Sequence, residues 1–128
     1  MLCVLPFAFA LGLCPDETVS GYVEPTTVWH LTEIDGAPYT ADATITFPKE
    51  GSVRGTGPCN TFTATQSVPV PWIRIRDIAS TSMTCPDGEA EAAYFAALQD
   101  MELIEVALDL LLLSTPDGRQ MVFEAGDG

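Results

Sequence analysis

The sequence predicts an α+β domain that is mainly β, with an antiparallel, barrel-like curled sheet of about 7–8 strands and one packed helix near 87–101. Three observations lead to this class. Apolar residues alternate with polar ones in several runs, as in strands that bury one face. Turn signals containing glycine or proline separate these runs. One stretch has the period of a helix. A chain of 128 residues is long enough for one such domain and too short for two.

The chain begins with an apolar run over residues 2–13, Leu-Cys-Val-Leu-Pro-Phe-Ala-Phe-Ala-Leu-Gly-Leu, which is too short to span a bilayer. Polar residues follow from Pro15 onward. We therefore expect residues 1–14 to be a signal peptide or lipoprotein leader, and the protein to be exported. The run lacks the Lys or Arg that usually precedes such a leader, and a buried strand or helix is the alternative.

Two processing routes fit this leader. Ala8-Phe9-Ala10 has the small-x-small pattern of signal cleavage, whereas Leu11-Gly12-Leu13-Cys14 resembles a lipoprotein box in which Cys14 would be acylated. The box is imperfect, because the residue before its cysteine is normally small and here is leucine. Cleavage after Ala10 would leave three cysteines and hence one unpaired thiol. Lipidation of Cys14 would leave Cys59 and Cys85 as one pair. Both routes stay open.

The composition of residues 15–26, with proline, glycine and scattered acids, predicts a linker, so the folded domain is expected over 27–124. Within the domain, pairs of apolar residues at alternate positions predict half-buried strands. These pairs are Trp29 and Leu31, Ile45 and Phe47, Ile73 and Ile75, and Ile104 and Val106. Residues 108–113 do not alternate, and we expect them to be buried on both faces.

Turn signals lie between these runs at Asp35-Gly36-Ala37-Pro38, Lys49-Glu50-Gly51 and Asp117-Gly118. Glycine supplies the positive φ that tight reversals need. We therefore expect antiparallel hairpins over 43–56 and 109–124.

The predicted helix has one apolar face, which consists of Ala90, Ala93, Tyr94, Ala97, Leu98 and Met101. Pro86 suits a first turn, and Asp87, Glu89 and Glu91 place negative charge where the helix dipole favours it. A calcium loop is the functional alternative for these acids, but their spacing and the lack of further ligands disfavour it.

Eighteen acidic residues against five basic ones give a formal net charge of −13. Nucleic-acid binding needs Lys and Arg to displace phosphate counterions, and the nearest approach to a basic cluster is Arg74 and Arg76. We therefore expect no nucleic-acid partner. Attraction to an anionic membrane surface is disfavoured for the same reason, so membrane attachment would require the lipid anchor.

Two cysteine motifs lie in the middle of the chain: Gly55-Thr56-Gly57-Pro58-Cys59-Asn60, and the stretch 78–86 that contains Cys85. In an exported protein Cys59 and Cys85 are expected to form a disulfide, and closing a loop of about 27 residues stabilises a fold by roughly 3.5 kcal/mol. Two reduced, buried thiols are the alternative. A metal or redox site is disfavoured, because His30 is the one histidine and the spacing is unlike C-x-x-C.

In order and spacing, these motifs resemble the META domain family of HslJ-like proteins over about residues 27–124. The residues that carry the resemblance are Trp29, Leu31, Gly55, Gly57, Cys59, Asn60, Thr81, Met83 and Cys85. The chain departs from the family at Pro58 and at 106–109, where glycine is more usual. The resemblance implies one antiparallel barrel-like domain with a packed helix. It also implies an exported or lipid-anchored envelope protein, in the periplasm or on the outer or inner membrane surface of a bacterium.

The resemblance implies little chemistry, since family members are associated with stress tolerance or with secretion and motility. We expect a non-enzymatic module that binds an unidentified envelope protein or apolar ligand, with no catalytic residue, cofactor or metal. A lipid carrier with a barrel cavity is the alternative, for which Ala64, Ala93 and Ala97 are small inward candidates. Trp72 has two interpretations, burial in the core or part of an exposed docking patch.

A hydrolase is the less favoured alternative. His30 stands between Trp29 and Leu31 and is expected to point to the opposite, solvent-facing side of its strand. Ser80 and Ser82 are expected to hydrogen-bond the backbone ahead of the helix. With eighteen carboxylates, an acid pair suited to glycosidase chemistry could also arise by chance.

Overall fold

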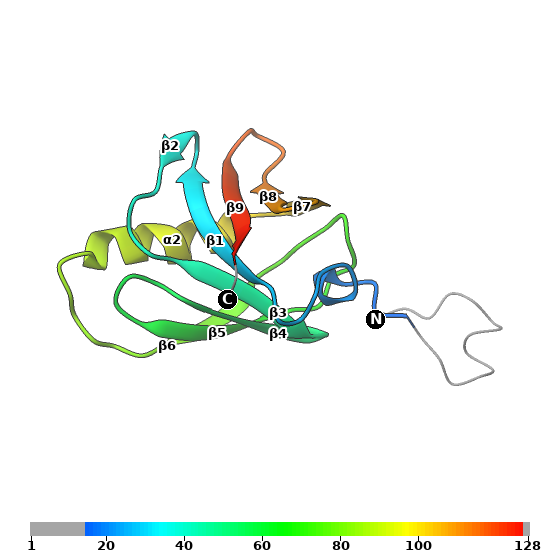
Figure 1. The fold of residues 1–128 in the computed structure, drawn as a ribbon, viewed down its shortest axis with the longest axis horizontal. Coiled ribbons are helices and arrows are strands. Elements are labelled where there is room, and N and C mark those ends of the chain that lie inside the picture. The colour runs from blue at the N-terminus through cyan, green and yellow to red at the C-terminus, as the bar shows by residue number, and fades with distance from the viewer. Residues whose placement is uncertain (1–14, 127–128) are drawn as a thin grey trace.

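Nine strands form one antiparallel sheet that curls around a helix in the computed structural model, which describes residues 15–126 (Figure 1). The strands follow the order β6-β5-β4-β3-β1-β9-β8-β7, and the short β2 pairs with β1. The elements are η1 (Val19–Gly21), β1 (Val28–Ile34), β2 (Ala37–Pro38), β3 (Thr44–Lys49), β4 (Gly51–Thr56), β5 (Thr61–Gln66), β6 (Arg76–Ser80), α2 (Gly88–Asp100), β7 (Leu103–Ala107), β8 (Leu110–Ser114) and β9 (Gln120–Gly126). The predicted fold class is confirmed.

The expected leader over 1–14, with the candidate lipidation site Cys14, lies outside the described residues. Among the elements that are described, no helix combines the length and apolar character needed to cross a membrane.

Both expected hairpins are confirmed. β3 pairs with β4, and β8 pairs with β9, each in antiparallel register. The turns contain Gly51 at φ +84° and Gly118 at φ +99°, a backbone conformation that disfavours any side chain. The third turn signal also forms a reversal, in which Asp35 and Gly36 both have positive φ between β1 and β2.

The core lies between the inner face of the curled sheet and α2. The aromatic ring of Tyr94 on α2 is fully buried and meets the ring of Phe62 on β5 edge-on, with 5.8 Å between centroids. Ala97, Leu98 and Met101 complete the buried side of the helix region, as the periodicity predicts. Ala93 is exposed, so it is not one of the small inward residues that the carrier alternative needs.

The prediction of a strand at Ile73 and Ile75 is wrong, although both side chains are buried. The neighbouring Pro69 and Pro71 have no N–H to give to a ladder. The amide of Ile73 instead donates to the carbonyl of Glu102 (3.0 Å). Residues 71–73 therefore run alongside residues 102–104, and no part of 67–75 joins the sheet as a strand. Pairing resumes at Arg76, where β6 begins.

Trp72 lies in this segment and is 53% exposed. Its backbone forms an isolated bridge with Leu103 on β7. The interpretation that places Trp72 in the core is therefore wrong, because the side chain projects opposite to the buried Ile73 beside it.

The leucine-rich run at 108–113 is buried on one face only. Leu111 and Leu113 are fully buried, whereas Leu108 and Leu110 are 96% and 48% exposed. Residues 110–114 form β8, whose alternation directs every second side chain outward. The expectation of burial on both faces is therefore wrong.

The segment expected to be a linker packs partly against the domain. Thr18 and Val19 are each 1% exposed, and the amide of Val70 donates to the carbonyl of Glu17 (2.8 Å). The carboxylate of Asp16 accepts hydrogen bonds from the amide and hydroxyl of Thr18 and the hydroxyl of Ser20. In this segment the polar residues therefore form a hydrogen-bonded turn and not a flexible linker.

The turn between β7 and β8 offers a test of backbone strain. Leu108 has φ +54°, a conformation that costs a residue with a side chain about 1–2 kcal/mol. Because its side chain is 96% exposed, Leu108→Gly removes this cost without loss of packing. We expect a gain of about 0.5–1 kcal/mol in the free energy of unfolding, measured in urea, after the entropy cost of glycine. Ala107→Gly is the matched control and should destabilise. A loss of stability in Leu108→Gly would contradict the assignment of strain.

Candidate functional site

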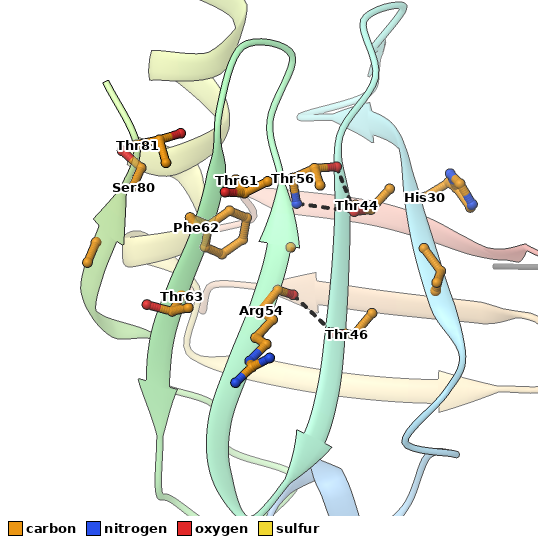
Figure 2. Close-up of a pocket in the computed structure, with 13 residues that line it drawn as sticks. His30, Thr44, Thr46, Arg54, Thr56, Thr61, Phe62, Thr63, Ser80 and Thr81 are labelled. Carbon is orange, nitrogen blue, oxygen red and sulfur yellow. Dashed lines mark hydrogen bonds between the residues drawn. The ribbon is translucent and has the colours of Figure 1, made fainter. Parts of the chain in front are cut away.

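A shallow groove with a volume of about 840 Å³ lies on the sheet face opposite to the core, across β1, β3, β4, β5 and β6 (Figure 2). Most of its lining side chains carry a hydroxyl, and we call it the threonine groove. It is lined by Val28, His30, Thr44, Thr46, Arg54, Gly55, Thr56, Thr61, Phe62, Thr63, Ala79, Ser80 and Thr81. All of these residues except Thr81 lie on strands, which fixes the spacing of the polar groups.

Strand alternation and register place the hydroxyls in rows. On β5, Phe62, Ala64 and Gln66 are buried, so Thr61, Thr63 and Thr65 point outward. Residues that are paired across neighbouring strands share a face. One row therefore runs from His30 through Thr44 and Thr56 to Thr61, and the next contains Thr46, Arg54 and Thr63.

Some of the polar groups in these rows are already used within the sheet. The hydroxyls of Thr44 and Thr56 share a hydrogen bond (2.8 Å), and the hydroxyl of Thr46 donates to the carbonyl of Arg54 (3.3 Å) (Figure 2). Within residues 15–126, the hydroxyls of Thr61 and Thr63 have no such partner, and both ion pairs involve Arg119. The guanidinium of Arg54 is therefore available to a ligand.

Beneath one end of the groove lies a buried polar cluster centred on Glu91 of α2. Its carboxylate accepts hydrogen bonds from the backbone amides of Cys59 (2.9 Å) and Asn60 (2.7 Å). The side-chain amide of Asn60 donates to the other oxygen of Glu91 (2.7 Å). These bonds fix the turn between β4 and β5 against the first turn of the helix.

Asn60 extends this cluster to the segment that follows β6. Its side-chain oxygen accepts from the hydroxyl of Thr81 (2.8 Å) and the amide of Met83 (2.7 Å), and its nitrogen also donates to the carbonyl of Met83 (3.0 Å). The Cys59–Cys85 disulfide joins the same two segments. The cluster therefore sets where Thr61 and Thr81, which both line the groove, lie relative to each other.

The charge of Glu91 is stabilised by this arrangement. Burial opposes ionisation, but the hydrogen bonds from Asn60 and the amide of Cys59 outweigh it, so the pKa of Glu91 is lowered below its ordinary value of 4.5. Tyr39, whose hydroxyl donates to the carbonyl of Ala90 (2.8 Å), has its pKa raised to about 12. Burial is the main cause, and the negative charges of Glu91 and Asp87 add to it.

The two glycines of the first cysteine motif are required by close approach. A Cβ on Gly55 would lie 2.2 Å from the carbonyl oxygen of Thr44, and one on Gly57 would lie 2.5 Å from the carboxylate of Glu91. Of the other residues that carry the resemblance, Trp29 and Leu31 are buried in the core. The Met83 side chain is 72% exposed and contributes through its backbone. These residues therefore support the groove from below.

The residues considered for hydrolysis are not brought together. His30 is exposed on the outer face of β1, as predicted, and Ser80 lies on β6 (Figure 2). Three strands separate β1 from β6, so the two side chains start about 19 Å apart at the usual strand spacing. A Ser–His pair needs hydrogen-bond contact. Within residues 15–126, no group of three or more His, Cys, Asp or Glu side chains is placed to hold a metal ion.

Two features of this site were not predicted from the sequence. Glu91 was assigned to the helix dipole, although it stands three residues before Tyr94 and seven before Leu98, on the buried face. The alternation of threonine with apolar residues over 61–65 was a second available signal, because it predicts a strand with an outward row of hydroxyls.

Comparisons with known proteins give a family and a fold. The sequence profile of the META domain matches residues 23–127. No curated protein matches the chain. One similar solved structure is that of a protein from Burkholderia xenovorans, which is 20% identical in sequence. The match covers 97% of this chain and 90% of that chain, with a TM-score of 0.63. A DUF4847 family protein from Bacteroides vulgatus ATCC 8482 is 15% identical, with 84% and 97% covered and a TM-score of 0.66. At these identities the structures support the fold alone.

The buried carboxylate should make an unusually large contribution to stability. Glu91→Gln replaces an ionised acceptor with an amide that cannot accept all three hydrogen bonds, so we expect a loss of about 2–3 kcal/mol in the free energy of unfolding at neutral pH. Glu89→Gln, an exposed change on the same helix, should cost less than about 0.5 kcal/mol.

The same pair of variants tests the charge of Glu91. Its pKa is lower in the folded chain than the ordinary 4.5, so the charge contributes stability above pH 4.5 that is lost as pH falls through the folded-state pKa. The difference between wild type and Glu91→Gln should therefore shrink in urea titrations below pH 4.5. An equally large difference at every pH would mean that the charge of Glu91 does not contribute to stability.

Removing the disulfide should destabilise the domain. We expect the double variant Cys59→Ser, Cys85→Ser to lose roughly 3.5 kcal/mol, because the unfolded chain is no longer constrained. Chemical denaturation with and without dithiothreitol measures this. Reductant should lower the stability of the wild type and leave the double variant unchanged. A wild type insensitive to reductant under denaturing conditions would mean that the bond is absent.

Proposed function

Because the chain belongs to the META domain family, we propose that it is a non-enzymatic envelope protein, exported or lipid-anchored, that binds a partner through the threonine groove. The observation that carries this proposal is the contrast between the two faces of the sheet. The inner face is filled by α2 and the core, whereas the outer face of β1, β3, β4, β5 and β6 holds the groove with its free polar groups.

The packing of the inner face does not favour the carrier alternative. Tyr94, Phe47, Phe123 and Leu98 meet in one cluster of side chains, each at most 1% exposed. Ala64 and Ala97 lie within this cluster. A lipid chain would have to displace well-packed side chains, which costs several kcal/mol per large residue. A ligand on the outer face needs no such rearrangement.

The placement of polar groups favours binding over hydrolysis. The groove offers hydroxyls, one guanidinium and one imidazole. In the described part of the chain His30 has no hydrogen bond to a hydroxyl, and the hydroxyl of its cross-strand neighbour Thr44 bonds to Thr56 instead. Binding through the groove would link the module to envelope stress tolerance or secretion, as expected for its family.

A charge placed in the groove tests the proposal in cells. Thr63→Asp puts a carboxylate at the centre of the outer face without disturbing the core, because Thr63 is exposed. In a strain that lacks the protein, we expect wild type to restore survival under envelope stress and Thr63→Asp to fail. Ala96→Asp, an exposed change of equal charge on α2, should restore survival like wild type.

Two measurements accompany this test. Circular dichroism of both variants checks that each is folded, so a failure of Thr63→Asp reports on the groove. The intact mass of the protein from an envelope fraction should begin after Ala10 or at an acylated Cys14. Equal survival with both variants would overturn the role of the groove, and an intact Met1 would overturn export.

A further inference from the structure

The few basic residues of this acidic chain gather on one face. Arg54 lies within the threonine groove. Register pairs Lys49 with Ser52, Ser52 with Thr65, and Thr65 with Arg76, so these four residues form a row across β3, β4, β5 and β6 beside the groove. We call it the cationic row. Lys49, Arg54 and Arg76 are all exposed. Three of the five basic residues therefore share the outer face.

The spacing of these cations follows from sheet geometry. Lys49 and Arg76 stand on strands three steps apart, which places their backbones about 14 Å from each other. Arg54 is two residues along β4 from Ser52, so it lies about 7 Å from the cationic row. The hydroxyls of Ser52, Thr63 and Thr65 occupy positions between the three charges. Charge and hydroxyl groups thus alternate over one continuous surface.

The positive charges of this surface are not neutralised by ion pairs. Within residues 15–126, both ion pairs involve Arg119, at the turn before β9. The nearby carboxylates are Glu50, in the turn after Lys49, and Asp77, which accepts a hydrogen bond from the hydroxyl of Thr65 (3.2 Å). Glu124 lies opposite His30 at the other side of the groove. At physiological ionic strength charges are screened over about 8 Å, so the local field is set by these three cations and by Glu50 and Asp77 beside them, and acids farther away do not cancel it.

We propose that the threonine groove and the cationic row bind an anionic carbohydrate, a hydroxyl-rich chain that carries carboxylate or phosphate groups. This inference rests on the proposed function and names the ligand of the same site. Guanidinium groups pair well with carboxylate and phosphate oxygens. The threonine hydroxyls, which both donate and accept, match the hydroxyls of sugars.

Two other polyanions fit this surface less well. An acidic peptide in an extended conformation binds best at a free strand edge, which β6 has, whereas β3, β4 and β5, which carry Lys49, Arg54 and most of the hydroxyls, are paired on both sides. Single-stranded nucleic acid relies on aromatic side chains that stack on bases, and the one Phe, Tyr or Trp in the groove lining, Phe62, is 3% exposed. Sugar hydroxyls need neither a free edge nor a stacking platform.

Titration with oligogalacturonate, which carries one carboxylate per sugar, tests this inference by calorimetry or fluorescence. We expect saturable binding that weakens as salt is added, and no binding of the fully methyl-esterified oligomer of the same length. Arg54→Gln should weaken binding at least roughly tenfold, the value of one charge-assisted hydrogen bond. Arg119→Gln makes the same change in net charge away from the groove and should leave the affinity within about twofold.

A second variant ensures that the result does not depend on whether Arg54→Gln folds. Lys49→Gln with Arg76→Gln should also weaken binding at least roughly tenfold, because both cations of the row are removed. Thermal denaturation checks that all variants are folded. Equal affinity of Arg54→Gln and Arg119→Gln, or equal binding of the neutral oligomer, would overturn the inference. Poly-glutamate or a single-stranded oligonucleotide that binds more tightly would overturn it as well.

The outcomes for ligand class and for proposed function are separable. If oligogalacturonate fails to bind while Thr63→Asp still loses envelope function, the ligand class is wrong and the groove remains the site. If oligogalacturonate binds and Thr63→Asp retains function in cells, the carbohydrate is bound but the proposed function is wrong.

Discussion

The ionised carboxylate of Glu91 is the constraint on which the rest of this structure depends. An isolated charge at a site only 7% exposed would be strongly unfavourable, so its three hydrogen bonds must all form. Two of the donors are the consecutive backbone amides of Cys59 and Asn60, in the turn after β4. The requirement to satisfy one charge therefore selects the shape of that turn, the position of α2 and the presence of Gly57 beside the carboxylate.

Asn60 carries this constraint outward. Because its side chain bonds both to Glu91 and to residues 81–83, the end of β6 is held against the start of β5. The amide of Thr81 adds a bond to the carbonyl of Thr61 (3.1 Å). The outer face near these residues is thus fixed by a buried network on the other side of the sheet. A groove that is fixed in this way pays little entropy on binding, since its groups are already ordered.

The sheet nonetheless does not close into a complete barrel. β6 and β7 are its two ends, and the segment 67–75, of which residues 71–73 run along residues 102–104, does not join the sheet as a strand. The side chain of Gln66 accepts from the amide of Arg74 (2.8 Å) and donates to the carbonyl of Val68 (2.6 Å), while the amide of Ile104 donates to the carbonyl of Pro71 (2.8 Å). Backbone groups that a barrel would pair between strands are here satisfied by a side chain and a proline-containing loop.

Elements with a local cause were predictable from the sequence. The hairpins follow from glycine at turns, and the helix follows from the spacing of Tyr94, Leu98 and Met101. The strand at Ile73 was not predictable from alternation, because buried side chains need not belong to a hydrogen-bonded ladder. Glu91 was missed for a related reason: its partners lie about thirty residues away, and a local pattern cannot distinguish a carboxylate at a helix N-terminus from one that the fold buries.

The charge of the candidate site was also not predictable from the sequence. A net charge of −13 describes the whole chain, and it led to the expectation of no nucleic-acid partner and no attraction to an anionic membrane surface. Register brings Lys49, Arg54 and Arg76, which are spread over 28 positions of the sequence, onto one face of four strands. Because screening limits each charge to its neighbourhood, a partner responds to the face and not to the sum. Net charge therefore constrains solubility and long-range steering, whereas the ligand of a sheet face depends on which residues the register places side by side.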